Sequence, residues 1–145
     1  MSKIVVLDYG SSNLRSVAKA LETVAEGNHK VTVTDKPKVI LSADKVVFPG
    51  QGAIGQCMQS LKEKELDNVI KQCILKKPFL GICLGLQSLM EYSDEDGGTE
   101  GLGILPGSVI RFTENAKDEK NNTYRFLQWD GTRFIKGKNI LCGMV

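Results

Sequence analysis

Short apolar runs alternate along the chain with longer segments in which apolar residues recur every three or four positions. The runs are typical of strands buried on both faces of a parallel sheet, and the longer segments are typical of amphipathic helices. We expect strands at 4–7, 31–33, 44–48 and 79–83. The apolar faces that predict helices are Leu14, Val17, Ala18, Leu21, Val24 and Ala25; Ile54, Cys57, Met58 and Leu61; Leu66, Val69, Ile70, Cys73 and Ile74; and Leu86, Leu89 and Met90.

The alternation of strands and helices predicts an α/β fold with a doubly wound, mainly parallel sheet and flanking helices. Asp35-Lys36-Pro37 is expected to end the second strand. The later segments are expected to be shorter: a solvated loop at 93–100, the turn Leu105-Pro106-Gly107 and then a strand within 104–112, an exposed hairpin or loop at 114–122, and strands at 125–131 and 140–142. With 145 residues, we expect residues 1–145 to form a single domain.

Composition and charge argue against several classes of function. The apolar fraction of 41% and the charged fraction of 25% are typical of globular proteins, and a net charge of +2 argues against a nucleic-acid or membrane partner. The first apolar run is too short for a signal peptide or a membrane span, so we expect a cytoplasmic protein. Cys57, Cys73, Cys83 and Cys142 are widely spaced and His29 is the only histidine, which predicts free thiols and no metal site. No motif indicates a cofactor.

The segment with the most evident chemistry is Phe-Leu-Gly-Ile-Cys-Leu-Gly-Leu-Gln at 79–87. It predicts a buried strand, a tight corner at Cys83 and the start of a helix, which is the geometry that lifts a nucleophile above a sheet. Gly81 and Gly85 let the backbone pass close to the corner, because a Cβ atom there would collide. Free amides at the start of a helix favour an anion, so Cys83 is predicted to react as a thiolate nucleophile. A buried structural cysteine is the alternative.

A second corner follows the third strand, at Pro49-Gly50-Gln51-Gly52-Ala53. Its two glycines permit a tight turn whose N–H groups face the carboxyl edge of the sheet, where open α/β sheets bind ligands. If Cys83 attacks a carbonyl carbon, the resulting oxyanion would lie near the Leu84 N–H and an N–H of the turn between Gly50 and Gly52. Preorganised donors of this kind contribute about 3–4 kcal/mol each in the transition state. Together the two corners predict an acyl-transfer site.

Four motifs, in this order, resemble those of the class I (triad-type) glutamine amidotransferases. They are Asp8-Tyr9-Gly10 with Asn13-Leu14-Arg15-Ser16-Val17, the turn at 49–53, Gly81-Ile82-Cys83-Leu84-Gly85-Leu86-Gln87, and Gly101-Leu102-Gly103-Ile104. Within that class they are similar to the glutaminase subunit of imidazole glycerol phosphate synthase and its relatives in surface-sugar biosynthesis. The resemblance covers residues 3–112 and implies a flavodoxin-like α/β fold.

The resemblance also implies a reaction, a substrate and a partner. Glutamine would be hydrolysed to glutamate and ammonia through a γ-glutamyl thioester on Cys83. Gly52 and Leu84 would supply the oxyanion hole, with Gly50 in the same turn, and Gln87 would help to hold glutamine. Ammonia would pass to a (β/α)₈-barrel cyclase or synthase subunit in a heterodimer, with Asn13 and Arg15 toward the interface. A surface position for Gln87 and a helix cap for Asn13 stay open as alternatives.

The resemblance stops where the family completes its triad with a His-x-Glu pair near the end of a longer chain. This sequence contains no such pair, and His29, between Asn28 and Lys30, is expected to be a surface-loop residue. The stretch at 127–131 also departs from the family pattern, so no role is carried over to it. Because a departing amine needs an acid, we expect this polypeptide to hydrolyse glutamine poorly or not at all. We also expect the C-terminal part of the domain to be incomplete, through truncation or a frameshift.

Two other functions fit the same residues. One is a non-catalytic, amidotransferase-like domain that binds or regulates a synthase. The other is a redox or stress protein in which oxidation of Cys83 is the event. The glycine turn at 49–53 favours the first of these over the second, because oxidation needs no oxyanion hole. The acceptor of the nitrogen, in histidine or in surface-sugar biosynthesis, stays open.

Overall fold

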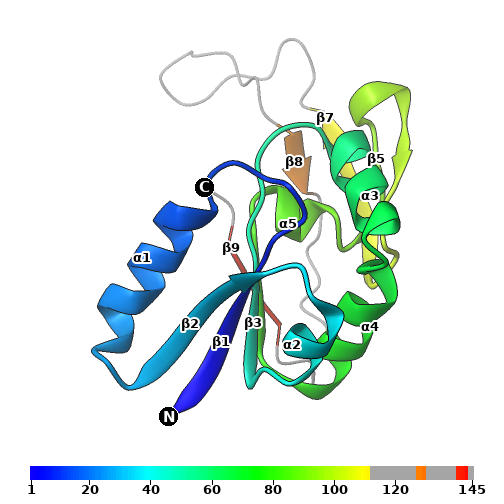
Figure 1. Ribbon diagram of the computed structural model, residues 1–145. Coiled ribbons are helices and arrows are strands. Elements are labelled where there is room, and N and C mark those ends of the chain that lie inside the picture. Colours follow the sequence, from blue (N-terminus) through cyan, green and yellow to red (C-terminus); the bar gives the residue numbers. More distant parts are fainter. Residues whose placement is uncertain (112–126, 130–139, 144–145) are drawn as a thin grey trace, which may run out of the picture.

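The computed structural model describes residues 1–111, 127–129 and 140–143. At its centre is a parallel sheet of five strands in the order β2-β1-β3-β4-β9 (Figure 1). The strands are β1 (Ser2–Leu7), β2 (His29–Thr34), β3 (Lys45–Phe48), β4 (Phe79–Ile82) and β9 (Ile140–Gly143). The predicted doubly wound, mainly parallel α/β fold is confirmed. Strand order reverses between β1 and β3, which makes the carboxyl ends of these two strands the place where such sheets bind ligands.

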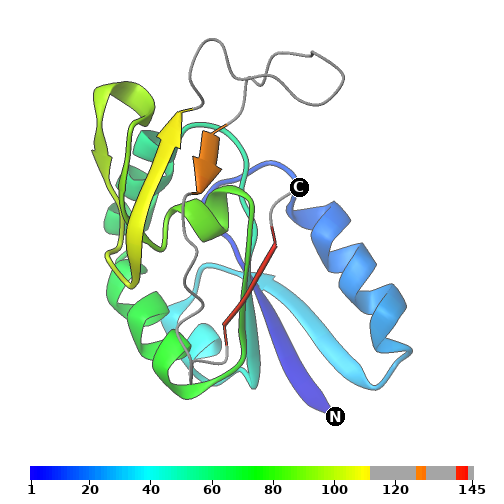
Figure 2. The ribbon, with the colours of Figure 1, turned by 180° about the vertical axis from the view of Figure 1, so that it is seen from behind.

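Alternating side chains of β1 build two cores, one on each face of the sheet. Val5 and Leu7 join the larger core with residues of α2 (Pro37–Leu41), α3 (Ile54–Glu63) and α4 (Asp67–Lys76). Ile4 and Val6 join the smaller core, against α1 (Leu14–Ala25). Figures 1 and 2 show α1 on one side of the sheet and α3 and α4 on the other. The period of two along β1 therefore decides which helices cover which face.

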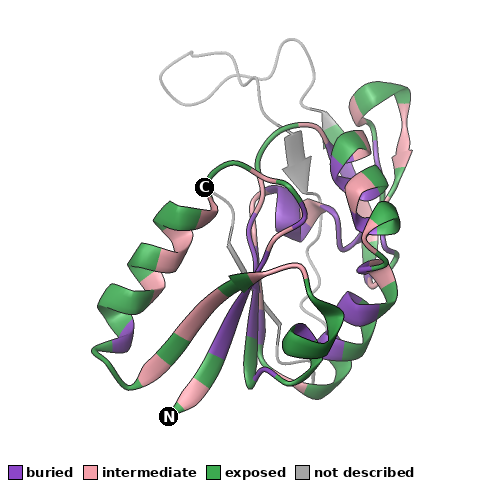
Figure 3. Cartoon of the chain, viewed as in Figure 1, coloured by how far each residue is buried: buried purple, intermediate pink, exposed green. Residues whose placement is uncertain are grey.

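The helical stripes predicted for α3 and α4 are confirmed as buried faces. Their members are all less than 9% exposed: Ile54, Cys57, Met58, Leu61, Val69, Ile70, Cys73 and Ile74, with Leu66 just before α4. The stripe of α1 is only partly covered, as Figure 3 shows by its green and pink surface. Val24 was predicted to share this apolar face, but its side chain is 77% exposed. At 100° per residue Val24 lies at the margin of the stripe, so it points past the sheet.

β2 ends at Thr34, directly before Asp35-Lys36-Pro37, so the predicted end of the second strand is confirmed. Pro37 then begins the short helix α2, where its missing N–H costs nothing. Two local predictions were wrong. The helix after Cys83 is a single turn, α5 (Leu84–Gln87), and Met90 opens a strand instead. Leu105-Pro106-Gly107 lies inside β7 (Leu105–Arg111) and is not a turn before it.

These corrections arise from a second sheet, in the order β6-β5-β7-β8, that the sequence pattern did not predict. Its other strands are β5 (Met90–Ser93), β6 (Thr99–Glu100) and β8 (Leu127–Trp129), and the short 3-10 helix η1 (Glu95–Gly97) joins β5 to β6. The segment 93–100, expected to be a loop, thus includes a hairpin turned at Gly97 and Gly98, both with positive φ. Figure 2 shows this sheet beside α3, away from α1.

The strands expected at 125–131 and 140–142 are observed as the shorter β8 and as β9. The hairpin or loop expected at 114–122 lies outside the described residues. Within the described part of the chain, the structure contains no helix with the length and apolar character needed to cross a membrane.

Candidate functional site

Cys83 stands at the corner between β4 and α5. Its backbone has φ 53° and ψ −117°, a conformation that costs a residue with a Cβ atom about 1–3 kcal/mol. Such strain persists only where the surrounding structure enforces it, and it is concentrated at functional sites. The side chain is half-buried, whereas its strand neighbours Phe79 and Gly81 are buried. The predicted elbow is therefore present, and the cysteine is its strained residue.

Two glycines make this corner possible. A Cβ atom on Gly85 would lie 1.8 Å from the carbonyl oxygen of Phe48, far inside any allowed contact. A Cβ atom on Gly81 would lie 3.1 Å from the Cα atom of Leu86. The close packing follows from the strand register, in which Phe48 pairs with Gly81. It brings the end of β3, and the turn that follows it, against the corner at Cys83.

The glycine turn at 49–53 lies directly against α5. The Leu84 N–H donates a hydrogen bond to the Gly50 carbonyl oxygen over 3.4 Å, longer than the usual 2.9–3.0 Å. The amide expected to face an oxyanion thus has an acceptor within the protein in this arrangement. Gly52 has φ +100° and open space around its Cα atom. The Gln51 side-chain amide donates to the Ser12 hydroxyl, which ties the turn to the loop after β1.

The thiols of the core differ from Cys83 in their surroundings. Cys57 is 2% exposed, and its Sγ lies 3.3 Å from the hydroxyl of Ser88, which itself donates to the Leu84 carbonyl over 2.7 Å. Burial raises the pKa of the Cys57 thiol and also that of Cys73. Both are thus neutral core residues, as predicted, and all three cysteines with described side chains are free.

Tyr9 is the residue of this region that the sequence interpretation missed. It follows β1 directly and is 4% exposed, and its ring packs edge-on against Phe48, with 5.4 Å between centroids. Among the described residues, its hydroxyl is the one buried side-chain N or O atom without a hydrogen-bond partner. Ser11 and Cys57 lie near it, but neither makes a hydrogen bond of ordinary geometry, and burial raises the pKa of Tyr9. The sequence could have pointed to Tyr9, because Asp8-Tyr9-Gly10 directly follows a buried strand.

A polar pocket of about 100 Å³ lies beside Tyr9, between the loop after β1, the glycine turn and α3. Its lining includes Ser11, Gln51, Cys57 and Leu84. Because the loop and the turn follow β1 and β3, the pocket occupies the point where strand order reverses. It is therefore where this class of sheet offers a ligand site.

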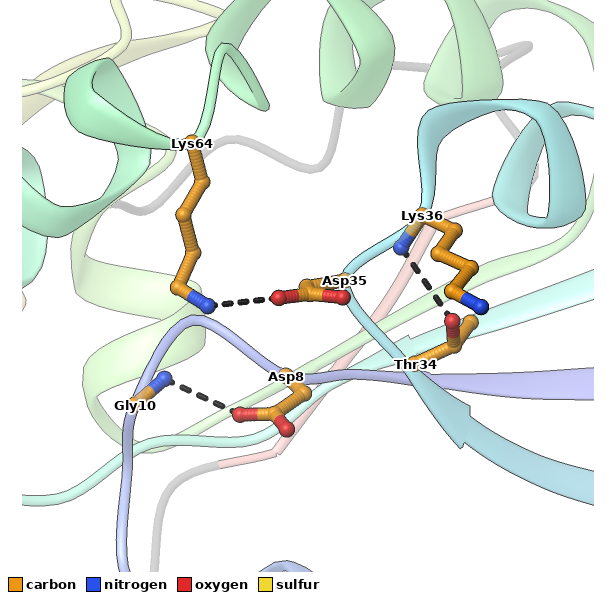
Figure 4. A network of polar contacts seen from close by, with 6 residues as sticks. All are labelled: Asp8, Gly10, Thr34, Asp35, Lys36 and Lys64. Atoms are coloured by element: carbon orange, nitrogen blue, oxygen red, sulfur yellow. Dashed lines mark hydrogen bonds and ion pairs between the residues drawn. The ribbon is translucent and has the colours of Figure 1, made fainter.

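Charged groups shape the neighbouring rim, at the ends of β1 and β2 (Figure 4). The Asp8 carboxylate accepts the Gly10 N–H over 3.1 Å, which turns the chain sharply after β1. The Lys64 ammonium donates to the Asp35 carboxylate over 2.7 Å, and this contact lowers the pKa of Asp35. The ion pair links the residue after α3 to the segment that follows β2, so this segment is held to the helical layer.

The remaining predicted site residues lie around this edge. Gln87 is half-buried at the end of α5. Asn13 occupies the position before α1, but its side chain makes no capping hydrogen bond, and both Asn13 and Arg15 are exposed. His29 was expected in a loop but opens β2 at the opposite edge of the sheet, where its ring contacts the Ser2 hydroxyl. Among the described residues, no group of three His, Cys, Asp or Glu side chains could hold a metal ion.

Comparison with known proteins identifies the family. The model of the family Glutamine amidotransferase class-I matches residues 5–130. The imidazole glycerol phosphate synthase subunit HisH of Nitrosococcus oceani is 55% identical over 120 residues, 83% of this chain and 57% of that protein. The subunit of the same name from Methylococcus capsulatus is 54% identical over 114 residues, 79% of this chain and 52% of that protein. The chain thus spans about half the length of these curated relatives.

A solved structure supports the same fold. A crystal structure described as a glutamine amidotransferase matches 74% of this chain and 56% of its own, with a TM-score of 0.60 and 16% sequence identity. At this identity the likeness concerns the fold alone. The family match over most of the chain, together with relatives more than 50% identical, decides the assignment. The chain belongs to the class-I glutamine amidotransferase family.

Proposed function

We propose that this chain carries the nucleophile of a glutaminase that releases ammonia from glutamine, as a subunit of imidazole glycerol phosphate synthase in histidine biosynthesis. The observation that carries the proposal is the strained Cys83 at the elbow, packed against a glycine turn at the carboxyl edge of the sheet. Relatives more than 50% identical, which are subunits of imidazole glycerol phosphate synthase, support the substrate and the pathway.

The chemistry requires a thiolate at Cys83 and donors for a developing oxyanion. The sulfur adds to the γ-carboxamide carbon of glutamine, and the carbonyl oxygen takes the negative charge. Collapse of this intermediate breaks the carbon–nitrogen bond and expels ammonia once the nitrogen has gained a proton. Water then cleaves the γ-glutamyl thioester to give glutamate and restores the thiol. Gln87, half-buried at the end of α5, is proposed to hold the substrate.

The oxyanion donors are proposed to be the N–H groups of Leu84 and Gly52. In the observed arrangement the Leu84 N–H is engaged by the Gly50 carbonyl, so this carbonyl has to move before the amide can face a substrate. The 3.4 Å bond is weak, and glycines on both sides of Gln51 let the peptide plane rotate with little steric hindrance. Turnover on this proposal therefore includes a rearrangement of the glycine turn.

Among the described residues, no histidine lies near Cys83 to protonate the leaving ammonia. His29 is the only histidine of the sequence, and it begins β2, whereas Cys83 follows the end of β4. With about 3.3 Å per strand residue, the two edges of this sheet are about 20 Å apart. We therefore propose that the 145-residue polypeptide adds Cys83 to glutamine but forms the thioester slowly, and so turns over glutamine slowly.

The partner is proposed to be a (β/α)₈-barrel cyclase subunit that receives the ammonia. Asn13 and Arg15 support this placement, because both are exposed at the start of α1, at the edge of the sheet that carries Cys83. Since the Asn13 side chain makes no capping hydrogen bond to α1, its amide is proposed to contact the partner. Replacing both residues by alanine is expected to weaken binding to the barrel subunit and to leave the reactivity of Cys83 unchanged.

The diazo-ketone analogue of L-glutamine tests the nucleophile. The reagent and iodoacetamide are each incubated with the protein, and the labelled cysteines are followed by mass spectrometry. Iodoacetamide measures access to each thiol, so the ratio of the two rates isolates recognition of the glutamine moiety. We expect this ratio to be at least about tenfold higher at Cys83 than at Cys57, Cys73 or Cys142. The reason is that N–H groups that bind the carbonyl oxygen of the reagent accelerate attack by the sulfur.

The D-enantiomer of the reagent is the matched control, since it has the same reactivity without the substrate's shape. If it labels Cys83 as fast as the L-form, or if the ratio at Cys83 equals that at the other cysteines, the glutaminase proposal is wrong. The alternative, a non-catalytic domain that only binds a synthase, is supported by the engaged Leu84 amide and predicts this second outcome.

A further inference from the structure

The buried Tyr9 hydroxyl makes no hydrogen bond with the described residues in the observed arrangement. It is the one buried side-chain polar atom, among the described residues, that lacks a hydrogen-bond partner. A buried donor without an acceptor costs free energy, and phenylalanine would fill the same space without that cost. The hydroxyl therefore points to a second arrangement in which it has an acceptor.

Ser11 and Cys57 lie near the hydroxyl without a hydrogen bond of ordinary geometry, and the Gly50 backbone also lies within its reach. A Cβ atom on Gly50 would lie 2.2 Å from the Tyr9 hydroxyl oxygen, so this oxygen packs directly against the Gly50 backbone. The same Cβ atom would lie 3.0 Å from the Leu84 Cβ atom, which places Tyr9, Gly50 and Leu84 in one cluster. The Tyr9 ring is fixed by its edge contact with Phe48, the last residue of β3.

The Gly50 carbonyl meanwhile accepts the Leu84 N–H through a long bond of 3.4 Å. If it leaves Leu84, it becomes an acceptor without a partner unless another donor is near. The Tyr9 hydroxyl is such a donor, and it stays protonated because burial raises its pKa. The pocket of about 100 Å³ beside Tyr9, Gln51 and Leu84 gives the peptide room to turn.

We propose that Tyr9 is a positioning residue. When the peptide between Gly50 and Gln51 rotates away from Leu84, the Tyr9 hydroxyl donates a hydrogen bond to the Gly50 carbonyl oxygen. One hydrogen bond replaces another, and the exchange releases the Leu84 N–H for the oxyanion. This inference rests on the proposed function, since it explains how the glycine turn becomes competent. The rival interpretation is a bound water molecule that satisfies the hydroxyl and leaves the turn alone.

Tyr9→Phe is the test, because it keeps the ring packed on Phe48 and removes only the hydroxyl. Tyr92→Phe is the matched control, since Tyr92 is 40% exposed and lies in β5 of the second sheet. Each variant is labelled at Cys83 with the diazo-ketone analogue of L-glutamine and with iodoacetamide. The first reagent presents a carbonyl to the oxyanion donors, whereas the second is attacked at a saturated carbon.

We expect Tyr9→Phe to slow diazo-ketone labelling by about tenfold and to leave iodoacetamide labelling unchanged, since one oxyanion donor then becomes available less often. Tyr92→Phe should change neither rate. Hydrogen exchange at the Leu84 amide gives a second readout. In Tyr9→Phe it should become slower, because the arrangement with a free amide is populated less; a general loosening of the structure would make it faster.

Three outcomes overturn the proposal. Unchanged diazo-ketone labelling in Tyr9→Phe assigns the hydroxyl to water. An equal loss with both reagents, or a variant that fails to fold, shows that the hydroxyl supports the resting structure instead. Failure of the proposed function is recognised separately, because the unsubstituted protein would then show no preference for Cys83 before any Tyr9 variant is made.

Discussion

Cys83 and its neighbouring glycines show how single residues determine this site. The sequence predicted the corner because Gly-x-Cys-x-Gly follows an apolar run, and the structure gives the reason: at Gly85 a Cβ atom would meet the Phe48 carbonyl at 1.8 Å. Tyr9 could not be predicted in the same way. Its importance depends on a contact with Gly50, forty-one residues later, which exists only once β1 and β3 are paired.

Gly85→Ala tests whether the corner depends on this close approach. The new methyl group would meet backbone, which cannot turn aside as a side chain would, so α5 has to shift away from β3. We expect the free energy of unfolding to fall by about 3 kcal/mol, the upper range for overpacking. Urea titration measures the loss, and labelling of Cys83 by the diazo-ketone should fall with it because Leu84 is displaced.

Gly27→Ala provides the comparison, because Gly27 has φ +77° and open space around it. Gly27→Ala is expected to lower the free energy of unfolding by about 1–2 kcal/mol, because the alanine has to adopt a left-handed backbone conformation. A loss in Gly85→Ala no greater than that in Gly27→Ala, with Cys83 labelling retained, would show that the corner tolerates a side chain.

At the scale of elements, prediction succeeded where a segment's own pattern determines its structure. The apolar face predicted between Leu14 and Ala25 lies on the observed helix α1, and α3 and α4 bury the predicted faces. It failed after Cys83, where Leu86, Leu89 and Met90 are spaced as on a helix but Met90 begins β5. Here a distant segment determines the local structure, since β5 is a strand that pairs with β7, beginning with Met90 opposite Leu105. The hairpin signal Asp96-Gly97-Gly98 was present in the sequence but was interpreted as a solvated loop.

The acidic segment that includes η1 has a specific role for α3. The Glu95 carboxylate accepts the Ile54 N–H over 3.1 Å, and Asp96 accepts the Gly55 N–H over 3.4 Å. These two amides belong to the first turn of α3, which has no capping side chain of its own. A carboxylate at this end is also favoured by the helix dipole. The second sheet thus stabilises the helix that follows the glycine turn.

Glu95→Ala should therefore destabilise the protein by about 1 kcal/mol, the usual effect of losing an N-terminal cap. Urea titration measures this change, and faster hydrogen exchange at the Ile54 amide would locate it. Asp94→Ala is the matched control, because this carboxylate is exposed, precedes η1 and makes no side-chain hydrogen bond to α3 among the described residues. Equal effects of the two substitutions would show that the segment acts only through its overall charge.

For the whole molecule, the sequence predicted the parallel sheet but not the second one. The central strands are continuous apolar runs such as Val5-Val6-Leu7 and Val46-Val47-Phe48, which indicate burial on both faces without reference to other segments. The second sheet combines two-residue and three-residue strands with a proline in β7, a pattern too short and irregular to recognise. The positions of the two corners were predictable for the same reason as the sheet, because the corners come directly after its strands.

The stability of the whole molecule should fall at alkaline pH. Burial raises the pKa values of Cys57, Cys73 and Tyr9, so the folded protein retains protons that the unfolded chain releases. An unfolded thiol titrates near pH 8.5 and a tyrosine near pH 10, so the loss begins above about pH 8.5 and steepens above about pH 10. Below about pH 8.5 both states hold these protons and the effect vanishes. Each retained proton lowers the free energy of unfolding by up to about 1.4 kcal/mol per pH unit.

Cys73→Ala separates this effect from packing. The side chain is fully buried in the larger core, so its removal has a packing cost that is the same at every pH. Urea titrations of the reduced protein and of the variant are compared at pH 7 and at pH 10. We expect the variant to be the less stable at pH 7 and the difference to shrink at pH 10, because the unsubstituted chain alone has lost the stabilisation of a neutral Cys73. A difference that stays constant would mean that the thiol ionises as readily in the folded core as in the unfolded chain.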